Sequence, residues 1–180
     1  MPEKFGCYWA GNKFGATIQV YPDGSVNVNH GGIEIGQGIN TKVAQAVAMK
    51  LQIPLSLIKV TSNTTIVQPN NSGTGGSTTS EMCVQAAMNA CDILLTRLAP
   101  FMQSGLDWID LITQANNANV DLQAKGWFVG QQSSLGPQQY QSTGAAVAEV
   151  EVDILTGQYQ VLRVDILFDA GVSMNPGIQI

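Results

Sequence analysis

The sequence has few charged residues, and few basic ones above all. Only 12% of its 180 residues are charged, with 8 Lys and Arg against 13 Asp and Glu, and the net charge is −5. Nucleic-acid-binding proteins gather Lys and Arg on one face, whereas here these residues are scattered, so nucleic acid is not an expected partner. No apolar run approaches the roughly 18 residues of a membrane span, so we expect no membrane segment.

Cysteine and histidine are also scarce. Cys7, Cys83 and Cys91 form no CxxC pair, so we do not expect this chain to ligate zinc, an iron–sulfur cluster or another metal. Cys83 and Cys91 fall on the apolar stripe of a predicted helix and are expected in the core. Three cysteines without a paired motif fit a protein of a reducing, cytoplasmic compartment. His30 is the only histidine, and since no catalytic partner can be placed beside it, we interpret it as structural.

Hydrophobic periodicity predicts an α+β fold in which β-hairpins pack with helices. We expect one domain over residues 1–180. In it, the helix over 106–115 carries Trp108, Ile109 and Ile112 on one face. The predicted elements, in chain order, are strands over 16–21 and 25–30, a helix over 41–51, a strand over 57–60, a loop over 61–72, helices over 79–98 and 106–115, a strand over 122–129, a loop over 130–139, and paired strands over 146–154 and 159–168.

Residues 31–38 form a first glycine-rich loop, which opens the 41–51 helix. It lacks the Gly-Lys-Ser/Thr of a nucleotide-binding P-loop and the GxGxxG spacing of a dinucleotide fold, so both sites are excluded. What the pattern predicts is a glycine loop that holds the Gln37 amide where it can both donate and accept hydrogen bonds.

Residues 73–81 form a second glycine-rich loop that leads directly into the longest helix. Gly75 and Gly76 allow close approach to the backbone, and Thr78 with Glu81 fits a capping box. A helix start of this kind suits a phosphate or another anion. Ser and Thr also favour N-caps where nothing binds, so the loop by itself leaves open a ligand site or an ordinary capped helix.

Three acidic residues, Glu149, Glu151 and Asp153, alternate along the strand over 146–154. Such a row could supply paired catalytic carboxylates. Alternation instead predicts that they share one solvated strand face, opposite a strand that carries Arg163, and we interpret them as structural.

Four motifs, in order and with family-like spacing, resemble the molybdenum hydroxylases, the family of aldehyde oxidase and xanthine dehydrogenase. His30 extends the first match, and together the motifs cover nearly the whole chain from about Tyr8. They are HGGIEIGQGINTK at 30–42, GGSTTSE at 75–81, AEVEVDILTG at 148–157 and DAGVSMNP at 169–176.

The resemblance implies that this segment binds the molybdenum–molybdopterin cofactor. Gln37 would hydrogen-bond the pterin-phosphate portion, while Thr79 and Ser80 would hold the terminal phosphate at the helix N-terminus. It implies no catalytic residue here, since the family's glutamate base lies in a GxGE-type motif further along. The implied cofactor-binding residues are Gly36, Gln37, Gly75, Gly76, Ser77, Thr79 and Ser80.

The implied activity is that of an oxidoreductase that hydroxylates an aldehyde or N-heterocycle with oxygen taken from water. In the family, 2Fe-2S clusters and FAD lie elsewhere in the same polypeptide, and the enzyme is a homodimer. The resemblance therefore presents this chain as an internal part of a longer protein, whose other partners are the rest of that polypeptide and a small-molecule substrate.

Two other hypotheses stay open at this point. One is a non-catalytic α+β module that binds a phosphorylated ligand through its glycine-rich loops. The other is a degenerate paralogue that no longer binds the cofactor. The intact glycines at 36, 38, 75 and 76 count against it, because a loop whose backbone no ligand approaches would be expected to lose its glycines first.

We predict that the 180-residue chain alone is inactive, because it lacks the upstream substrate pocket and the downstream glutamate that the resemblance implies. The measurement is cofactor-dependent aldehyde oxidation by the isolated chain. Turnover above that of free cofactor would contradict the prediction.

Overall fold

The computed structural model describes residues 11–61, 63–102, 105–130, 143–169 and 171. The chain divides into two compact units, one over Cys7–Gln132 and one that comprises Met1–Gly6 with Ser133–Ile180. The mixture of helices and strands confirms the predicted α+β class. The expectation of a single domain stays a prediction.

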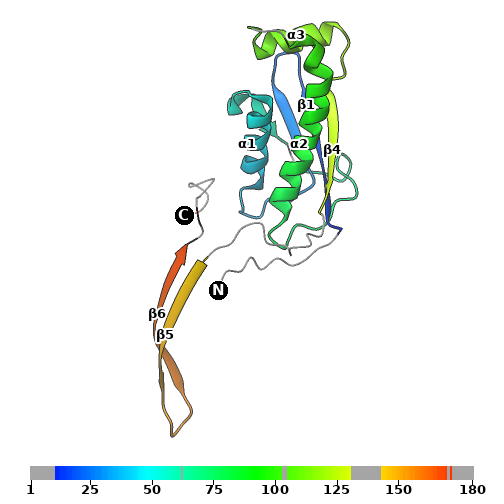
Figure 1. Cartoon of the computed structure of the whole chain (residues 1–180). Coiled ribbons are helices and arrows are strands. Elements are labelled where there is room, and N and C mark those ends of the chain that lie inside the picture. Colours follow the sequence, from blue (N-terminus) through cyan, green and yellow to red (C-terminus); the bar gives the residue numbers. More distant parts are fainter. Residues whose placement is uncertain (1–10, 62, 103–104, 131–142, 170, 172–180) are drawn as a thin grey trace. The chain divides into compact units, whose positions relative to one another are not determined.

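The larger unit contains a four-stranded sheet in the order β3-β2-β1-β4. The β1–β2 hairpin and the β1–β4 pair are antiparallel, while β2 and β3 are parallel. A parallel pair needs a crossover, and α1 provides it between β2 and β3 (Figure 1). The strands are β1 (Lys13–Val20), β2 (Val26–His30), β3 (Ile58–Val60) and β4 (Gln123–Val129).

Helices α1 (Ile39–Leu51) and α2 (Thr79–Leu98) cover one face of this sheet (Figure 1). Their apolar stripes meet alternate residues of β1 in one core, because a strand turns every second side chain to the same face. The buried members include Phe14, Ala16, Ile18, Val43, Val47, Cys83, Ala86, Ala87, Ala90, Cys91 and Leu94. The predictions for both helices and both cysteines are confirmed, with α1 starting two residues before Thr41.

At Gly126 a helix and the sheet approach each other closely. A Cβ atom there would lie 1.9 Å from the carbonyl oxygen of Ala86 in α2. The small residues of α2 and this glycine together let the helix backbone lie directly against β4.

The third helix, α3 (Trp108–Asn117), corrects the prediction for 106–115. It begins at Trp108 because the Asp107 carboxylate accepts the Asp110 N–H at 2.8 Å as an N-cap. Its buried residues are Leu111, Ile112 and Ala115, whereas Ile109 is 48% exposed, so the predicted face was wrong at Ile109.

The remaining short elements agree with the predicted pattern apart from their ends. Leu57, predicted as strand, belongs to a 3-10 turn, η1 (Leu55–Leu57), and another such turn, η2 (Ala99–Phe101), follows α2. The 61–72 segment is a loop without helix or strand wherever it is described. Most of the predicted 130–139 loop, Cys7 and the 172–176 part of the last motif lie outside the described residues.

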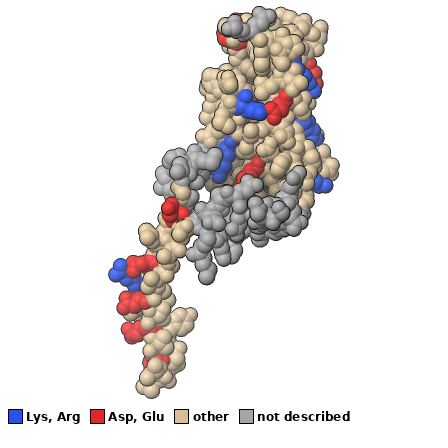
Figure 2. Space-filling view, viewed as in Figure 1, with Lys and Arg blue, Asp and Glu red and all other residues tan. Residues whose placement is uncertain are grey.

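The second unit contains an antiparallel ribbon of β5 (Thr143–Val152) and β6 (Tyr159–Asp169), which confirms the predicted hairpin. Glu149 lies opposite Arg163 in the register, as predicted. Figure 2 shows acidic side chains along the ribbon, with basic atoms beside them. Asp153 accepts the Leu155 N–H at 2.8 Å, so it shapes the turn.

We predict that Gly126→Ala lowers the free energy of unfolding by about 2 kcal/mol, because the new methyl group overlaps the α2 backbone and forces the helix away from β4. The measurement is urea unfolding followed by circular dichroism. Gly73→Ala is the control, since a Cβ there has open space. Equal stability of the two variants would contradict the close packing.

Candidate functional site

The two glycine loops meet where α1 and α2 begin. A Cβ atom at Gly32 would lie 2.6 Å from Cδ1 of Ile39 and 2.9 Å from Cγ2 of Thr79, the first residues of the two helices. The Ile33 N–H donates to the Thr74 hydroxyl at 2.8 Å, which ties the loops together. Both helices therefore direct their N-termini, with their partial positive charge, to one place.

The helices also run in the same direction from this place. Lys50, in the last turn of α1, forms an ion pair with Asp92 of α2 at 2.6 Å. The N-terminal contact at Gly32 and this ion pair fix α1 alongside the first part of α2 (Figure 1). The positive ends of two parallel helices are thus brought together, which favours a negative charge nearby.

In the first loop, the Glu34 carboxylate bonds to the backbone at the start of α1. Its Oε1 accepts the N–H groups of Gly36 at 3.0 Å and Gly38 at 2.9 Å, and its Oε2 accepts that of Asn40 at 3.3 Å. Desolvation acts to raise the pKa of Glu34, but the backbone N–H groups outweigh it and the pKa is lowered. Glu34 is therefore a carboxylate anion at the N-terminus of α1.

Gln37 lies over the same loop with both ends of its amide engaged. Nε2 donates to the Ile33 carbonyl at 2.8 Å, and Oε1 accepts the Ile35 N–H at 2.7 Å. This confirms that the amide both donates and accepts. An amide has two N–H donors and two acceptor lone pairs, so Gln37 retains capacity for a ligand.

The backbone of both loops is open where the cofactor residues were predicted. A Cβ atom at Gly36 or Gly75 would meet no atom within 4 Å. Gly36, Gly76 and Ser77 have φ angles of 102°, 63° and 56°, in the left-handed region. For Ser77 this conformation carries a steric cost that glycine avoids. The loops therefore present bare backbone, and Ser77 presents an exposed side chain in a strained conformation.

The start of α2 differs from the predicted capping box. Thr78 is the N-cap residue, but its hydroxyl makes no capping hydrogen bond and its Oγ1 is buried without a partner among the described residues. The hydroxyl of Thr79 instead accepts the Gly75 N–H at 3.2 Å. Thr79 is buried and Ser80 is partly exposed. The first turn of α2 is thus uncapped by its N-cap side chain.

His30 is fully buried beneath the first loop. Its Nδ1 accepts the Gly32 N–H at 3.2 Å, so the proton lies on Nε2, which donates to Oδ1 of Asn40 at 2.9 Å. Burial lowers the pKa of His30, partly offset by Asn40 and the charge of Glu34. These hydrogen bonds link the end of β2 to the start of α1 and support the structural interpretation of His30.

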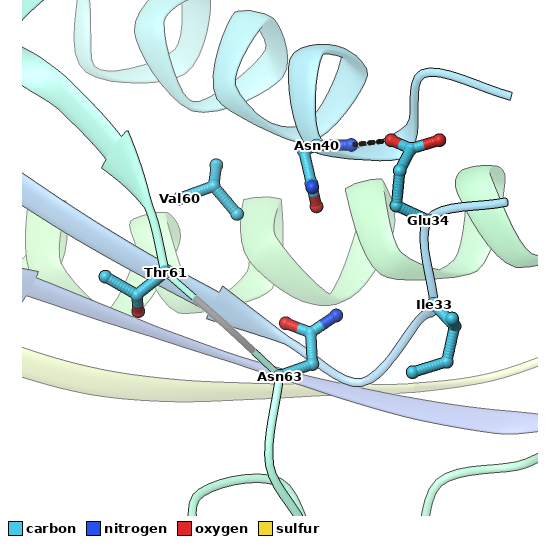
Figure 3. Close-up of a pocket in the computed structure, with 6 residues that line it drawn as sticks. All are labelled: Ile33, Glu34, Asn40, Val60, Thr61 and Asn63. Carbon is cyan, nitrogen blue, oxygen red and sulfur yellow. Dashed lines mark hydrogen bonds between the residues drawn. The ribbon is translucent and has the colours of Figure 1, made fainter. Parts of the chain in front are cut away.

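An open cavity of about 330 Å³ lies beside the first loop. Glu34 and Asn40 line one side of it and Asn63 and Thr61 another, with Ile33 and Val60 as apolar walls (Figure 3). The Asn63 amide donates to the Gly32 carbonyl, which connects the 61–72 loop to the first glycine loop. The cavity is therefore lined in part by the residues that hold the first glycine loop in place.

The other candidate chemistries have no support in the part of the chain that the structure describes. No three His, Cys, Asp or Glu side chains there gather as metal ligands. Burial raises the pKa of both the Cys83 and Cys91 thiols to about 12, so they stay protonated. No described helix has the length and hydropathy to span a bilayer.

Sequence reasoning missed several residues that build the site. Glu34, Asn40, Asn63 and Thr74 hold the loops, although none was among the predicted cofactor residues. The spacing of Glu34 two and four residues before Gly36 and Gly38 is the signal that could have identified its role, since those N–H groups precede a helix.

Comparison with known proteins identifies the class of protein to which this chain belongs. A model of the molybdopterin cofactor-binding domain matches residues 2–180, and the chain belongs to this family. The chain is 41% identical to aldehyde oxidase 3 of Rattus norvegicus over 92% of its length, and 40% identical to xanthine dehydrogenase/oxidase of Felis catus over 100%. It spans only 13% and 14% of those two relatives.

Solved structures agree with this fold. The aldehyde oxidoreductase of Desulfovibrio gigas matches with a TM-score of 0.66 and 22% identity, covering 92% of this chain and 19% of the other. The CO dehydrogenase of Oligotropha carboxidovorans matches with a TM-score of 0.64 and 23% identity, covering 92% and 23%. These likenesses support the fold.

We predict that the free energy of unfolding falls as pH decreases below 6.5, the ordinary pKa of histidine. The folded state lowers the pKa of His30, so the unfolded state binds more protons and stability rises with pH across this window. The measurement is urea unfolding between pH 7 and about pH 5, above the range where carboxylates titrate.

His30→Gln is the control for this prediction, because glutamine cannot titrate. Its stability at pH 7 is lower, but its slope between pH 6.5 and about pH 5 is flatter. The same slope in both proteins would show that another group is responsible.

Proposed function

We propose that this chain is the molybdopterin-binding portion of a molybdenum hydroxylase of the aldehyde oxidase and xanthine dehydrogenase type. The observation that carries the proposal is the meeting of two open glycine loops at the N-termini of two parallel helices, within a chain that belongs to the molybdopterin cofactor-binding family. The catalytic glutamate, the 2Fe-2S clusters and FAD would lie elsewhere in the whole protein.

The described residues fit such a cofactor. Its phosphate requires N–H donors and positive potential, which the first turn of α2 supplies without a cap from the Thr78 side chain. Its flat pterin requires close access to backbone and an amide, which Gly36, Gly75 and Gln37 supply.

Each predicted residue then has a physical task. Gln37 orients the pterin with its remaining donor and acceptor, while the glycines at 36, 75 and 76 leave room for it. Ser77 presents its hydroxyl from the strained turn. Ser80 and the N–H groups of the first turn of α2 hold the terminal phosphate, and Thr79 adds its own N–H while its hydroxyl fixes Gly75.

When bound, the cofactor supplies the redox chemistry that converts an aldehyde or N-heterocycle into its hydroxylated product with oxygen from water. This chain binds and orients it. The substrate class is a proposal for the whole protein, supported by the relatives' names. The homodimer is a proposal that rests on the family resemblance alone. The non-catalytic phosphate-binding module is the alternative that the following test separates.

We predict that Gln37→Ala in the full-length protein lowers the molybdopterin content about ten-fold, because paired hydrogen bonds to the pterin are lost. The measurement is fluorescence of the pterin released from purified protein. Gln45→Ala, an exposed glutamine on α1, is the matched control and keeps the wild-type content. Absence of molybdopterin from the wild-type protein would instead support the non-catalytic module.

A further inference from the structure

Glu34 stands out because its carboxylate bonds backbone N–H groups of the first loop and of the start of α1. Its two oxygens bond the N–H groups of Gly36, Gly38 and Asn40, at 3.0, 2.9 and 3.3 Å. Gly36 and Gly38 have φ angles of 102° and 72°, so the loop is held in left-handed turns that the carboxylate bridges. The proposed binding of the cofactor assigns no task to this side chain.

The hydrogen bonds of the Glu34 carboxylate, here called the bridge, hold the residues on both sides of Gln37. The flanking residues Gly36 and Gly38 are both bonded to one oxygen of Glu34, which fixes the backbone on either side of Gln37. The Gln37 amide in turn closes on Ile33 and Ile35, the neighbours of Glu34. The direction of the Gln37 side chain therefore depends on Glu34.

The bridge also makes the two helix starts unequal. The N-terminus of α1 already has an anion, because Glu34 occupies the N–H groups of Gly38 and Asn40. A second anion at α1 would compete with the fixed Glu34 carboxylate for the N–H groups of Gly38 and Asn40 and be repelled by it. At α2 the acidic residue of the first turn, Glu81, lies within the helix, and the N-cap hydroxyl makes no capping bond.

We propose that Glu34 is a positioning residue that holds Gln37 toward the pterin and closes the start of α1, so that the cofactor's phosphate is accepted only at the start of α2. This inference rests on the proposed function. It assigns Glu34 no contact with the reacting atoms.

The first experiment compares cofactor release from full-length holoenzyme. Glu34→Gln removes the charge and turns one oxygen into a donor that faces the Asn40 N–H. We expect pterin release and amide exchange of residues 36–40 to be faster by about ten-fold or more, as charge-assisted bonds are lost.

Asp23→Asn is the matched control. Asp23 also accepts a backbone N–H, that of Ser25 at 2.9 Å, but in the β1–β2 turn, at the opposite end of β2 from the loop. A merely structural role for Glu34 predicts that both variants release cofactor only in proportion to their lost stability. That outcome would overturn the proposal.

The second experiment uses inorganic phosphate on the cofactor-free full-length protein. In the wild type, we expect phosphate to slow amide exchange in residues 79–81 and not in residues 38–40. In Glu34→Ala, both segments should gain protection. Protection of residues 38–40 in the wild type would contradict the closure of α1.

The outcomes distinguish the two claims. If the wild-type protein carries no molybdopterin and phosphate protects neither segment, the proposed function fails. If the wild type carries the cofactor and Glu34→Gln behaves as Asp23→Asn does, only the positioning role of Glu34 fails.

Discussion

The contact that the site depends on is the packing of two helix starts against Gly32. Ile39 and Thr79 both lie where a Cβ atom would project from this residue, so the helices can approach each other there only because glycine has no side chain. The Ile33–Thr74 hydrogen bond and the buried His30 then fix the loop on either side of it. Any larger residue would separate the helix starts.

Charged side chains lie near both ends of α1 and of α2. Lys50 and Arg97 lie in the last turns of α1 and α2, where a cation offsets the negative end of a helix dipole. At the other end, Glu34 neutralises α1 from outside the helix, and Glu81 lies in the first turn of α2. Cationic side chains thus offset both helix dipoles at the C-termini. At the N-termini, which meet, the acidic residue lies before the helix in α1 and within the helix in α2.

Elements with local signals could be predicted from the sequence. The α2 helix begins at Thr79 and ends at Leu98 as its apolar stripe indicated, and the alternation of β5 and β6 gave their pairing. The buried face of α3 could not be predicted this way. It depends on contacts with a distant turn: Trp108 donates to the Gly24 carbonyl 84 residues away in sequence, and Ile109 lies beside the same Gly24 while it stays 48% exposed.

The site was predictable in outline but not in its hydrogen bonds. Glycine content located both loops, yet the Thr78 side chain makes no capping bond, and the Thr78 backbone has φ −117° and ψ −16° rather than the extended conformation usual for an N-cap. The role of Glu34 depends on left-handed turns at Gly36 and Gly38, and the link between the loops joins residues 41 positions apart. A periodic pattern contains no information on contacts of this kind.

Ser77 shows what such a site demands of its sequence. A serine in the left-handed region is less stable there than glycine by about 1 kcal/mol, although glycine already stands at the two preceding positions. If its hydroxyl serves the cofactor, folding stability alone would favour glycine while binding favours serine. Selection for a more stable domain and selection for a better cofactor site would then act on this one residue in opposite directions.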